Sequence, residues 1–232
     1  MTAPEAAPTT PRSRGLALLA RTEYRPVETA EERDAVYRLR YRAYTHAGLM
    51  EPNGSGRVSD RYDDAPNAWI LAVHVDGELC GSVRIHLLTA GERGCNTTDL
   101  YGEVLHPRLD GGEVLIDAAR LVADPEATRR HPDLGMLLVR MPYVACEHFG
   151  ADVGLAMVRD DHAPFYRRFF GHEVLAGPRP FPGWTTRKQV LMASDFRSVR
   201  DRVAARFPAM ASTAAERRRL FGPDVRRAAA AE

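Results

Sequence analysis

Hydrophobic and polar residues alternate along two neighbouring segments, and this pattern predicts a β-hairpin. Apolar side chains occupy every second position from Trp69 to Val75, and the alternation resumes from Leu79 to Leu87. Asp76-Gly77 between them is a turn signal, because both residue types tolerate a positive φ. Further apolar runs predict strands at residues 113–122, 153–158, 173–175 and 187–192.

Apolar residues three and four positions apart predict the helices. Thr29 and Glu32 have the spacing of a capping box at the start of the first helix, and Thr213 and Glu216 repeat it before the last one. The other helices are predicted at residues 134–149, 161–170 and 195–206, whereas residues 89–112 are predicted to be a long excursion. This order favours a mixed α/β fold, in which one continuous central sheet carries helices on both faces.

The chain is predicted to hold one main domain with an extension at each end. Residues 1–20 begin with a stretch rich in Ala, Pro and Thr without apolar periodicity, and they are predicted to be a disordered tail. Residues 21–194 are predicted to form the domain, and residues 195–232 a C-terminal helical extension.

Composition narrows the class of protein. The 232 residues carry a net charge of only +1, whereas a protein held to nucleic acid by bulk charge is far more basic, so no nucleic acid is expected as a partner. No apolar run approaches the ~18 residues of a membrane helix, so we expect no integral membrane segment and a cytoplasmic location. The three cysteines form no CxxC pair and the histidines no HxxxH pattern, so no metal site is expected.

Two charged residues interrupt the apolar strand predicted at residues 113–122. Asp117 and Arg120 are costly in such a strand unless they are paired or functional. Three positions apart, they would face opposite sides of a straight strand. A β-bulge would bring both to one face, and bulges are common beside active sites.

Four short motifs follow one another in order along the chain. They are Leu39-Arg-Tyr-Arg-Ala-Tyr44, Asp60-Arg-Tyr-Asp63, Gly81-Ser-Val-Arg84 and Asp117-Ala-Ala-Arg120. In this series the chain resembles the acyl-homoserine lactone synthases and their relatives, the N-acyl amino acid synthases. Both have the GNAT (acyl-CoA N-acyltransferase) fold, so the resemblance implies a GNAT-like acyltransferase domain. It covers roughly residues 25–222, and the stretch from Phe149 to Gly183 favours the N-acyl amino acid synthases.

Departures from the family patterns bear on the substrates. Asp117 stands where the lactone synthases usually have Glu, and Ala119 stands where they have Ser. The glycine-rich loop that binds the pyrophosphate of coenzyme A in GNAT enzymes is reduced here to Arg130-His-Pro-Asp-Leu-Gly135. Such a loop needs small residues and free backbone N–H groups at a helix start. Its loss favours an acyl chain on the phosphopantetheine arm of an acyl-carrier protein over acyl-CoA as the donor.

The reaction that the resemblance implies is attack of an amine on an acyl thioester, which gives an amide and needs no bound cofactor. Asp117 is the candidate base, acting through water, and Tyr166 is the candidate hydrogen-bond donor to the departing thiol. Arg84 is the third candidate catalytic residue. The predicted network around them comprises Arg40, Tyr44, Asp60, Asp63 and Arg120. Its members either bind the amino-acid acceptor or form ion pairs that tie the N-terminal helix to the sheet.

Three further interpretations stay open at this point. Arg129 and Arg130, with Gly135, are the candidate docking site for an acidic carrier protein, and the alternative is a solvated loop. The apolar side chains of residues 136, 137, 141 and 149 either line an acyl tunnel or fill the core. The favoured function is synthesis of a long-chain N-acyl amino acid, and the alternatives are a lactone synthase that uses S-adenosylmethionine and a non-catalytic sensor of acyl chains or acylated carrier.

Overall fold

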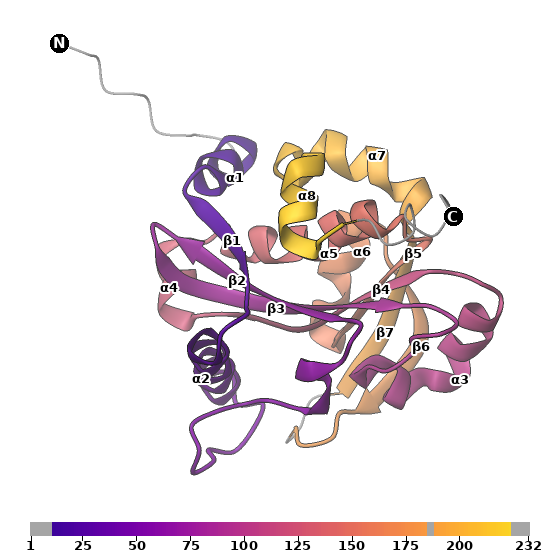
Figure 1. The fold of residues 1–232 in the computed structure, drawn as a ribbon, viewed down its shortest axis with the longest axis horizontal. Coiled ribbons are helices and arrows are strands. Elements are labelled where there is room, and N and C mark those ends of the chain that lie inside the picture. Colours follow the sequence, from indigo (N-terminus) through magenta and orange to yellow (C-terminus); the bar gives the residue numbers. More distant parts are fainter. Residues whose placement is uncertain (1–10, 185–187, 224–232) are drawn as a thin grey trace.

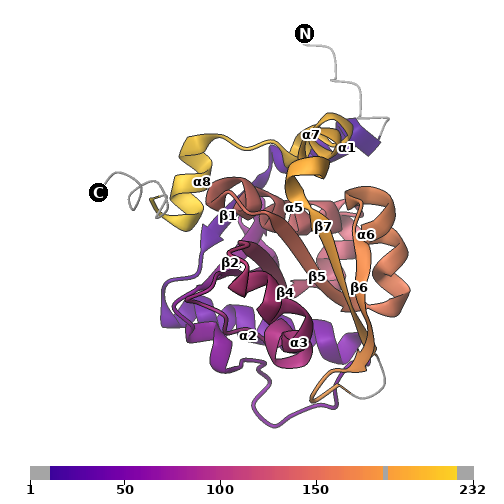
Figure 2. The same cartoon turned by 90° about the vertical axis from the view of Figure 1, so that its right-hand side faces the viewer.

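The protein is built on one mixed sheet, seen from two directions in Figures 1 and 2. The computed structural model describes residues 11–184 and 188–223. Within these residues the sheet has seven strands in the order β1-β2-β3-β4-β5-β7-β6. They are β1 (Thr22–Pro26), β2 (Ala68–Val75), β3 (Glu78–Leu88), β4 (Leu115–Ala123), β5 (Val153–Arg159), β6 (Glu173–Pro180) and β7 (Lys188–Asp195). Only β4 and β5 pair in parallel.

Helices cover both faces of this sheet, as the sequence predicted. One face carries α1 (Pro11–Leu19), α5 (Leu134–Phe149), α6 (Ala163–Phe170), α7 (Phe196–Arg206) and α8 (Ala214–Phe221). The other carries α2 (Ala30–His46), α3 (Asn96–Asp110) and the short 3₁₀ helix η1 (Arg61–Asp64). The remaining helices are α4 (Pro125–Arg130), η2 (Asp160–His162) and η3 (Pro208–Met210). The chain thus has the mixed α/β architecture expected of the GNAT fold.

Local capping chemistry explains why the predicted helices begin where they do. The Thr29 side chain accepts from the backbone N–H of Glu32, and the Glu32 carboxylate accepts from that of Thr29, which completes the predicted capping box. Thr213 caps α8 through Glu216 N–H, although no reciprocal bond is formed there. The predicted hairpin is also confirmed, with Asp76 and Gly77 at positive φ in its turn.

Besides the short helices α4, η1 and η3, three elements were missed from the sequence. β1 is short and has no long apolar run, and it is held by pairing with β2. α3 lies inside the predicted excursion, hidden by an unusual cysteine cap, an internal proline and non-helical backbone at Tyr101. α1 occupies residues 11–19 of the tail predicted to be disordered, which corrects that prediction for these residues. It is anchored by Leu18, which is buried in the main core. Residues 1–10 lie outside the described part of the chain.

β4 contains a β-bulge, the feature that would bring Asp117 and Arg120 to one face of the strand. Ser82 pairs with Val122 and Arg84 pairs with Ala119, so two residues of β4 lie opposite Val83 alone. Arg120 is one of these two and has φ = 51°, a conformation that turns its side chain out of the regular alternation. Arg120 thereby reaches the same carboxylate as Arg84, as the contacts below show.

None of the helices in residues 11–184 and 188–223 combines the length and the apolar character needed to cross a bilayer.

Candidate active site

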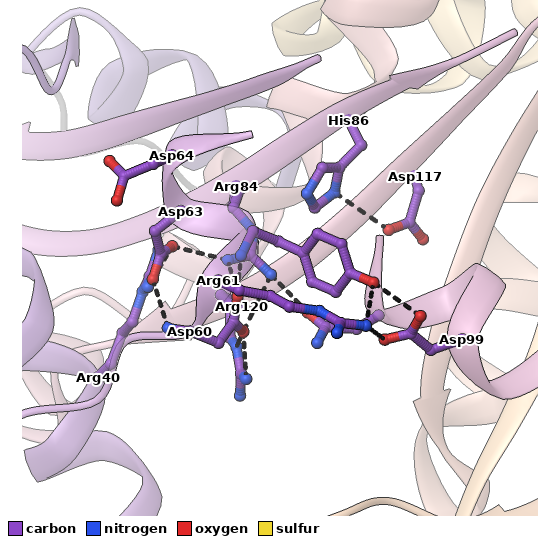
Figure 3. Close-up of polar contacts among 12 residues, drawn as sticks. Arg40, Asp60, Arg61, Asp63, Asp64, Arg84, His86, Asp99, Asp117 and Arg120 are labelled. Atoms are coloured by element: carbon purple, nitrogen blue, oxygen red, sulfur yellow. Dashed lines mark hydrogen bonds and ion pairs between the residues drawn. The ribbon is translucent and has the colours of Figure 1, made fainter. Parts of the chain in front are cut away.

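A buried network of arginines and aspartates links α2, η1, β3 and β4 (Figure 3). Arg84 Nη1 donates to Asp60 Oδ1 and to Asp63 Oδ1, both at 2.7 Å. Arg40 Nη1 donates to Asp63 Oδ1 at 2.8 Å, and Arg120 Nε donates to Asp60 Oδ2 at 3.0 Å. The structure therefore brings these five predicted residues into one cluster.

The aspartates are presented by the start of η1. Asp60 caps this turn by accepting from Tyr62 N–H, and the Asp63 carboxylate accepts in return from Asp60 N–H. The Asp-x-x-Asp spacing is thus a capping box made with two aspartates, and it aims both carboxylates at the sheet. Removing either residue would disturb the turn as well as the ion pairs.

The network carries an excess of positive charge. It holds three guanidinium groups but only two carboxylates, and the side chains of Arg40 and Arg84 have no solvent exposure. Burial on its own would raise the pKa of Asp60, but the hydrogen bond from Arg84 and the charge of Arg120 outweigh it and hold that pKa well below its usual range. Both carboxylates therefore accept from the guanidinium groups, and among these five residues the positive charges outnumber the negative ones by one.

Arg120 is the network member that lines a cavity. This cavity has a volume of about 230 Å³ and opens where the pairing of β4 and β5 ends, after Ala118 and Ala156. Three aromatic side chains gather at this end. The Arg120 guanidinium lies 5.5 Å from the ring centre of Phe181, and Trp184 packs on both Phe181 and Tyr44. Tyr44, predicted as a network residue, thus belongs to the cavity wall.

The part of the cavity between α5, α6 and α7 is mostly apolar. Its walls on these helices include Val139, Pro142, Tyr143, Cys146, Phe170, Phe196, Val199 and Val203. The apolar residues first considered for a tunnel, at positions 136, 137, 141 and 149, are instead in or against the main core. None of the four is among the residues that line the cavity, and the 3.6-residue period alone could not tell which side chains of α5 meet it.

Tyr166 lines the same apolar region, beside His172. Their ring centres are 5.7 Å apart. Burial raises the pKa of Tyr166 to about 12, so its hydroxyl remains a hydrogen-bond donor at neutral pH. Burial lowers the pKa of His172 to about 4, so this imidazole is neutral there.

Asp117 is fully buried next to the network but outside the cavity wall. Its Oδ1 accepts from Thr97 Oγ1 at 2.8 Å, and its Oδ2 lies 3.4 Å from His86 Nδ1. His86 is equally buried, and neither ring nitrogen has a hydrogen-bond partner among the described residues. The two residues are opposite each other on β4 and β3, two pairs along from Arg84 and on the same face of the sheet.

His86, Cys95 and Asp117 are also the group that could hold a metal ion among the described residues. A thiol binds a metal as the thiolate. Burial, and secondarily the charge of Asp117, raises the pKa of Cys95 far above its usual range, so the sulfur retains its proton. A metal ion bound here would have to displace this proton.

The residues predicted to dock a carrier protein lie on α4 and at the start of α5, away from the network. Arg129 pairs with Glu126 in its own helix, and Arg130 Nη2 donates to Glu78 at 2.7 Å. Gly135 lies in the first turn of α5. Both arginine side chains are at least half exposed, and each is already balanced by an acidic neighbour.

The sequence analysis missed several residues of the site. Asn96 lines the cavity and accepts from Arg84 Nη2, and Gln189 lines it from β7. Phe181 and Trp184 line it as well. Asn96 begins a helix that was not predicted, and Gln189 lies at the polar start of a strand, so no local pattern marked either one.

Comparisons with known proteins agree with this geometry. The family model described as N-acyl amino acid synthase FeeM matches residues 35–195. The solved structure of FeeM from uncultured soil microbes superposes with a TM-score of 0.65 at 17% identity, covering 78% of this chain and 94% of that one. A CoA-dependent acyl-homoserine lactone synthase, BjaI, solved with SAM and isopentyl-CoA, gives a TM-score of 0.55 at 17% identity, covering 77% and 84%.

A putative N-acetyltransferase from Lactobacillus plantarum shares the fold more distantly. It gives a TM-score of 0.51 at 15% identity and covers 75% of this chain and 98% of that one. No curated protein sequence matches the chain.

Proposed function

The chain belongs to the FeeM family of N-acyl amino acid synthases, and from this premise we propose that it moves a fatty acyl chain from the thioester of an acyl-carrier protein to the amine of an amino acid. The product is a long-chain N-acyl amino acid. The observation that carries the proposal is the position of Arg120, where a charged network with one unbalanced positive charge meets an apolar cavity. A carboxylate and an alkyl chain are what such a site accommodates together.

Arg120 binds the carboxylate of the acceptor amino acid. Its side chain is the most exposed of the three network arginines, at 11%, whereas the side chains of Arg40 and Arg84 have no solvent exposure. A guanidinium can hold a carboxylate through two parallel hydrogen bonds, which fixes its orientation as well as its position. Asp60 fixes the position of Arg120 by accepting its hydrogen bond, and the Phe181 ring beside the guanidinium limits the access of water to the bound carboxylate.

The acyl chain of the donor occupies the apolar part of the cavity between α5, α6 and α7. Burial of a long alkyl chain there contributes about 0.8 kcal/mol for each methylene group removed from water. The thioester then lies beside the bulge of β4, where an unpaired backbone N–H can stabilise the oxyanion of the tetrahedral intermediate. Holding the amine and the thioester in contact in this way accounts for much of the rate enhancement.

Proton transfer completes the reaction. The acceptor amine gives up a proton as its nitrogen bonds to the acyl carbon, and Asp117 receives it through His86 or an intervening water. When the C–S bond breaks, the sulfur of the phosphopantetheine leaves with a hydrogen bond from the Tyr166 hydroxyl, which is uncharged at neutral pH. Arg84 contributes by holding Asp60, Asp63 and Asn96 in place.

Product analysis with purified protein tests this function. Long-chain acyl-carrier protein is incubated with a mixture of the proteinogenic amino acids, and the extract is examined by mass spectrometry. N-acyl amino acids are the expected products. Acyl-homoserine lactones formed on addition of S-adenosylmethionine would assign the protein to the other enzyme class, and binding of acylated carrier without any product would make it a sensor.

A substitution at Arg120 tests the role of the carboxylate site. Arg120→Lys keeps the positive charge but loses the two-pronged hydrogen bond, so the KM for the amino acid should rise about tenfold or more. The KM for the acylated carrier should stay unchanged. An unchanged acceptor KM would place the carboxylate elsewhere.

A further inference from the structure

Gln189 is the only glutamine of the chain, and it is buried in the wall of the cavity. Its residue exposure is 2%, and its amide nitrogen Nε2 has no hydrogen-bond partner among the described residues. Buried polar groups in folded proteins are nearly always hydrogen-bonded, so an unpartnered amide facing a cavity calls for an explanation. A ligand that supplies the missing acceptor is the direct one.

The side chain of Gln189 belongs to the face of the sheet that carries α3. Successive residues of a strand point to opposite faces. Leu191, two positions along, packs in the core cluster that includes Tyr101 and Leu105 of α3, whereas Val190 and Met192 pack with Ala163 of α6. Gln189 therefore faces the same side of the sheet as Asn96, the first residue of α3.

The position of Gln189 along the sheet is equally informative. It pairs with Arg159, the last residue of β5, which lies beyond the point where β4 and β5 stop pairing. The backbone there is fixed, because Tyr101 of α3 donates from its hydroxyl to the Gln189 carbonyl. The amide is thus carried by a rigid strand at the opening between β4 and β5, and α3 closes this region on the face opposite the α5–α7 side.

We propose that Gln189 is a substrate-binding residue, whose Nε2 donates a hydrogen bond to an oxygen atom of the acceptor amino acid. This inference rests on the proposed function. It assigns the acceptor to the α3 face and leaves the α5–α7 side to the acyl chain. Gln189 and Arg120 then hold the acceptor from β7 and β4, on opposite sides of the opening, and orient its amine toward the thioester.

The variant Gln189→Met separates binding from structure. Methionine has nearly the same length and shape as glutamine but lacks the amide, so the variant removes the donor without opening a void. The KM for the best-accepted amino acid should rise about tenfold, and the KM for the acylated carrier should not change. The melting temperature without substrate should stay the same or increase, because an unpartnered buried polar group has been removed.

Tyr101→Phe is the matched control. It deletes the hydroxyl that holds the Gln189 carbonyl but leaves the amide in place, so it should lower the melting temperature without raising the acceptor KM. If Gln189 acted only through the position of its strand, Tyr101→Phe would raise the acceptor KM as well.

The outcomes distinguish this inference from the function on which it rests. Wild-type protein that forms N-acyl amino acids while Gln189→Met keeps the wild-type acceptor KM would refute the role of Gln189 alone. A change confined to the carrier KM, or a large loss of thermal stability in Gln189→Met, would refute it as well. Wild-type protein that forms no such product would refute both proposals.

Discussion

His86 and Asp117 face each other across β3 and β4, with His86 Nδ1 3.4 Å from Asp117 Oδ2 and no solvent access to either side chain. The other carboxylate oxygen accepts from Thr97. An ionisable pair that is buried without further partners is costly, and such pairs concentrate at functional sites. The pair lies two positions from Arg84 on the same face of the sheet, and the proposed reaction uses it as the proton acceptor.

Asp117→Asn tests whether this pair accepts the proton. Asparagine keeps an oxygen for the bond from Thr97, so the fold should be retained, but the variant cannot take up a proton. The kcat should fall by about a hundredfold or more, which is the usual contribution of a general base, with little change in the KM for either substrate. Single-turnover rates with preloaded acyl-carrier protein would measure the chemical step directly. A kcat equal to that of the wild type would exclude Asp117 as the base.

The stability of the network depends on Asp63. Its carboxylate accepts from Arg40 and Arg84 and has 1% side-chain exposure, so Asp63→Ala leaves the buried Arg40 guanidinium without its carboxylate partner and Arg84 with Asp60 alone. Breaking a buried pair in this way costs about 3–5 kcal/mol of the free energy of unfolding. Urea titration should show this loss.

The neighbouring Asp64 provides the control for Asp63. Its side chain is 82% exposed and pairs with Arg33 at the surface. Asp64→Ala should change the free energy of unfolding by less than about 1 kcal/mol. Equal effects of the two substitutions would mean that the buried network does not stabilise the fold.

Docking of an acidic carrier protein to α4 is tested by charge reversal. Arg129→Glu together with Arg130→Glu should raise the KM for acyl-carrier protein by about tenfold, without affecting turnover of a small acyl-pantetheine thioester. Both arginines are exposed, so the fold should tolerate the change.

A second basic surface serves as the comparison for docking. Four exposed arginines of α6 and α7 line a groove on the surface: Arg167, Arg168, Arg202 and Arg206. Reversal of Arg167 and Arg168 should leave the carrier KM unchanged. If this second variant alone raises that KM, the carrier docks at α6 and α7 and the prediction for α4 is wrong.

The sequence predicted the network better than it predicted the cavity, for a physical reason. Asp60, Asp63, Arg84 and Arg120 lie in short motifs whose charges would be costly if unpaired, so their convergence follows from the energetics of burial. The sequence also offered a bulge in β4 as a way to bring Asp117 and Arg120 to one face, and β4 contains a bulge at Arg120.

Gln189, Asn96 and Trp184 could not be predicted in this way. Each is a single residue without a periodic or charged partner nearby in the sequence, and their common location depends on where β4 and β5 stop pairing. That point is set by the three-dimensional arrangement of the sheet. The same limitation explains why the sequence left open whether Met136 and Leu137 line a tunnel or fill the core, because Val139 and Tyr143 differ from them only in what packs against them.

His172 should make the protein less stable as the pH falls. Burial lowers the pKa of its imidazole from 6.5 to about 4 in the folded protein. Between pH 6.5 and 4 the imidazole is protonated in the unfolded chain but remains neutral in the folded protein. The free energy of unfolding therefore decreases as the pH falls through this range. A shift of this size corresponds to at most roughly 3 kcal/mol.

His172→Asn removes this titration while keeping a polar side chain at the position. Urea unfolding at a series of pH values should give a flatter curve for the variant than for the wild type between pH 6.5 and 4. Some slope should remain, because burial also lowers the pKa of His74. His106→Asn, at an exposed position of α3, is the control and should leave the slope unchanged. Parallel curves for His172→Asn and the wild type would show that His172 takes up its proton as readily in the folded protein as in the unfolded chain.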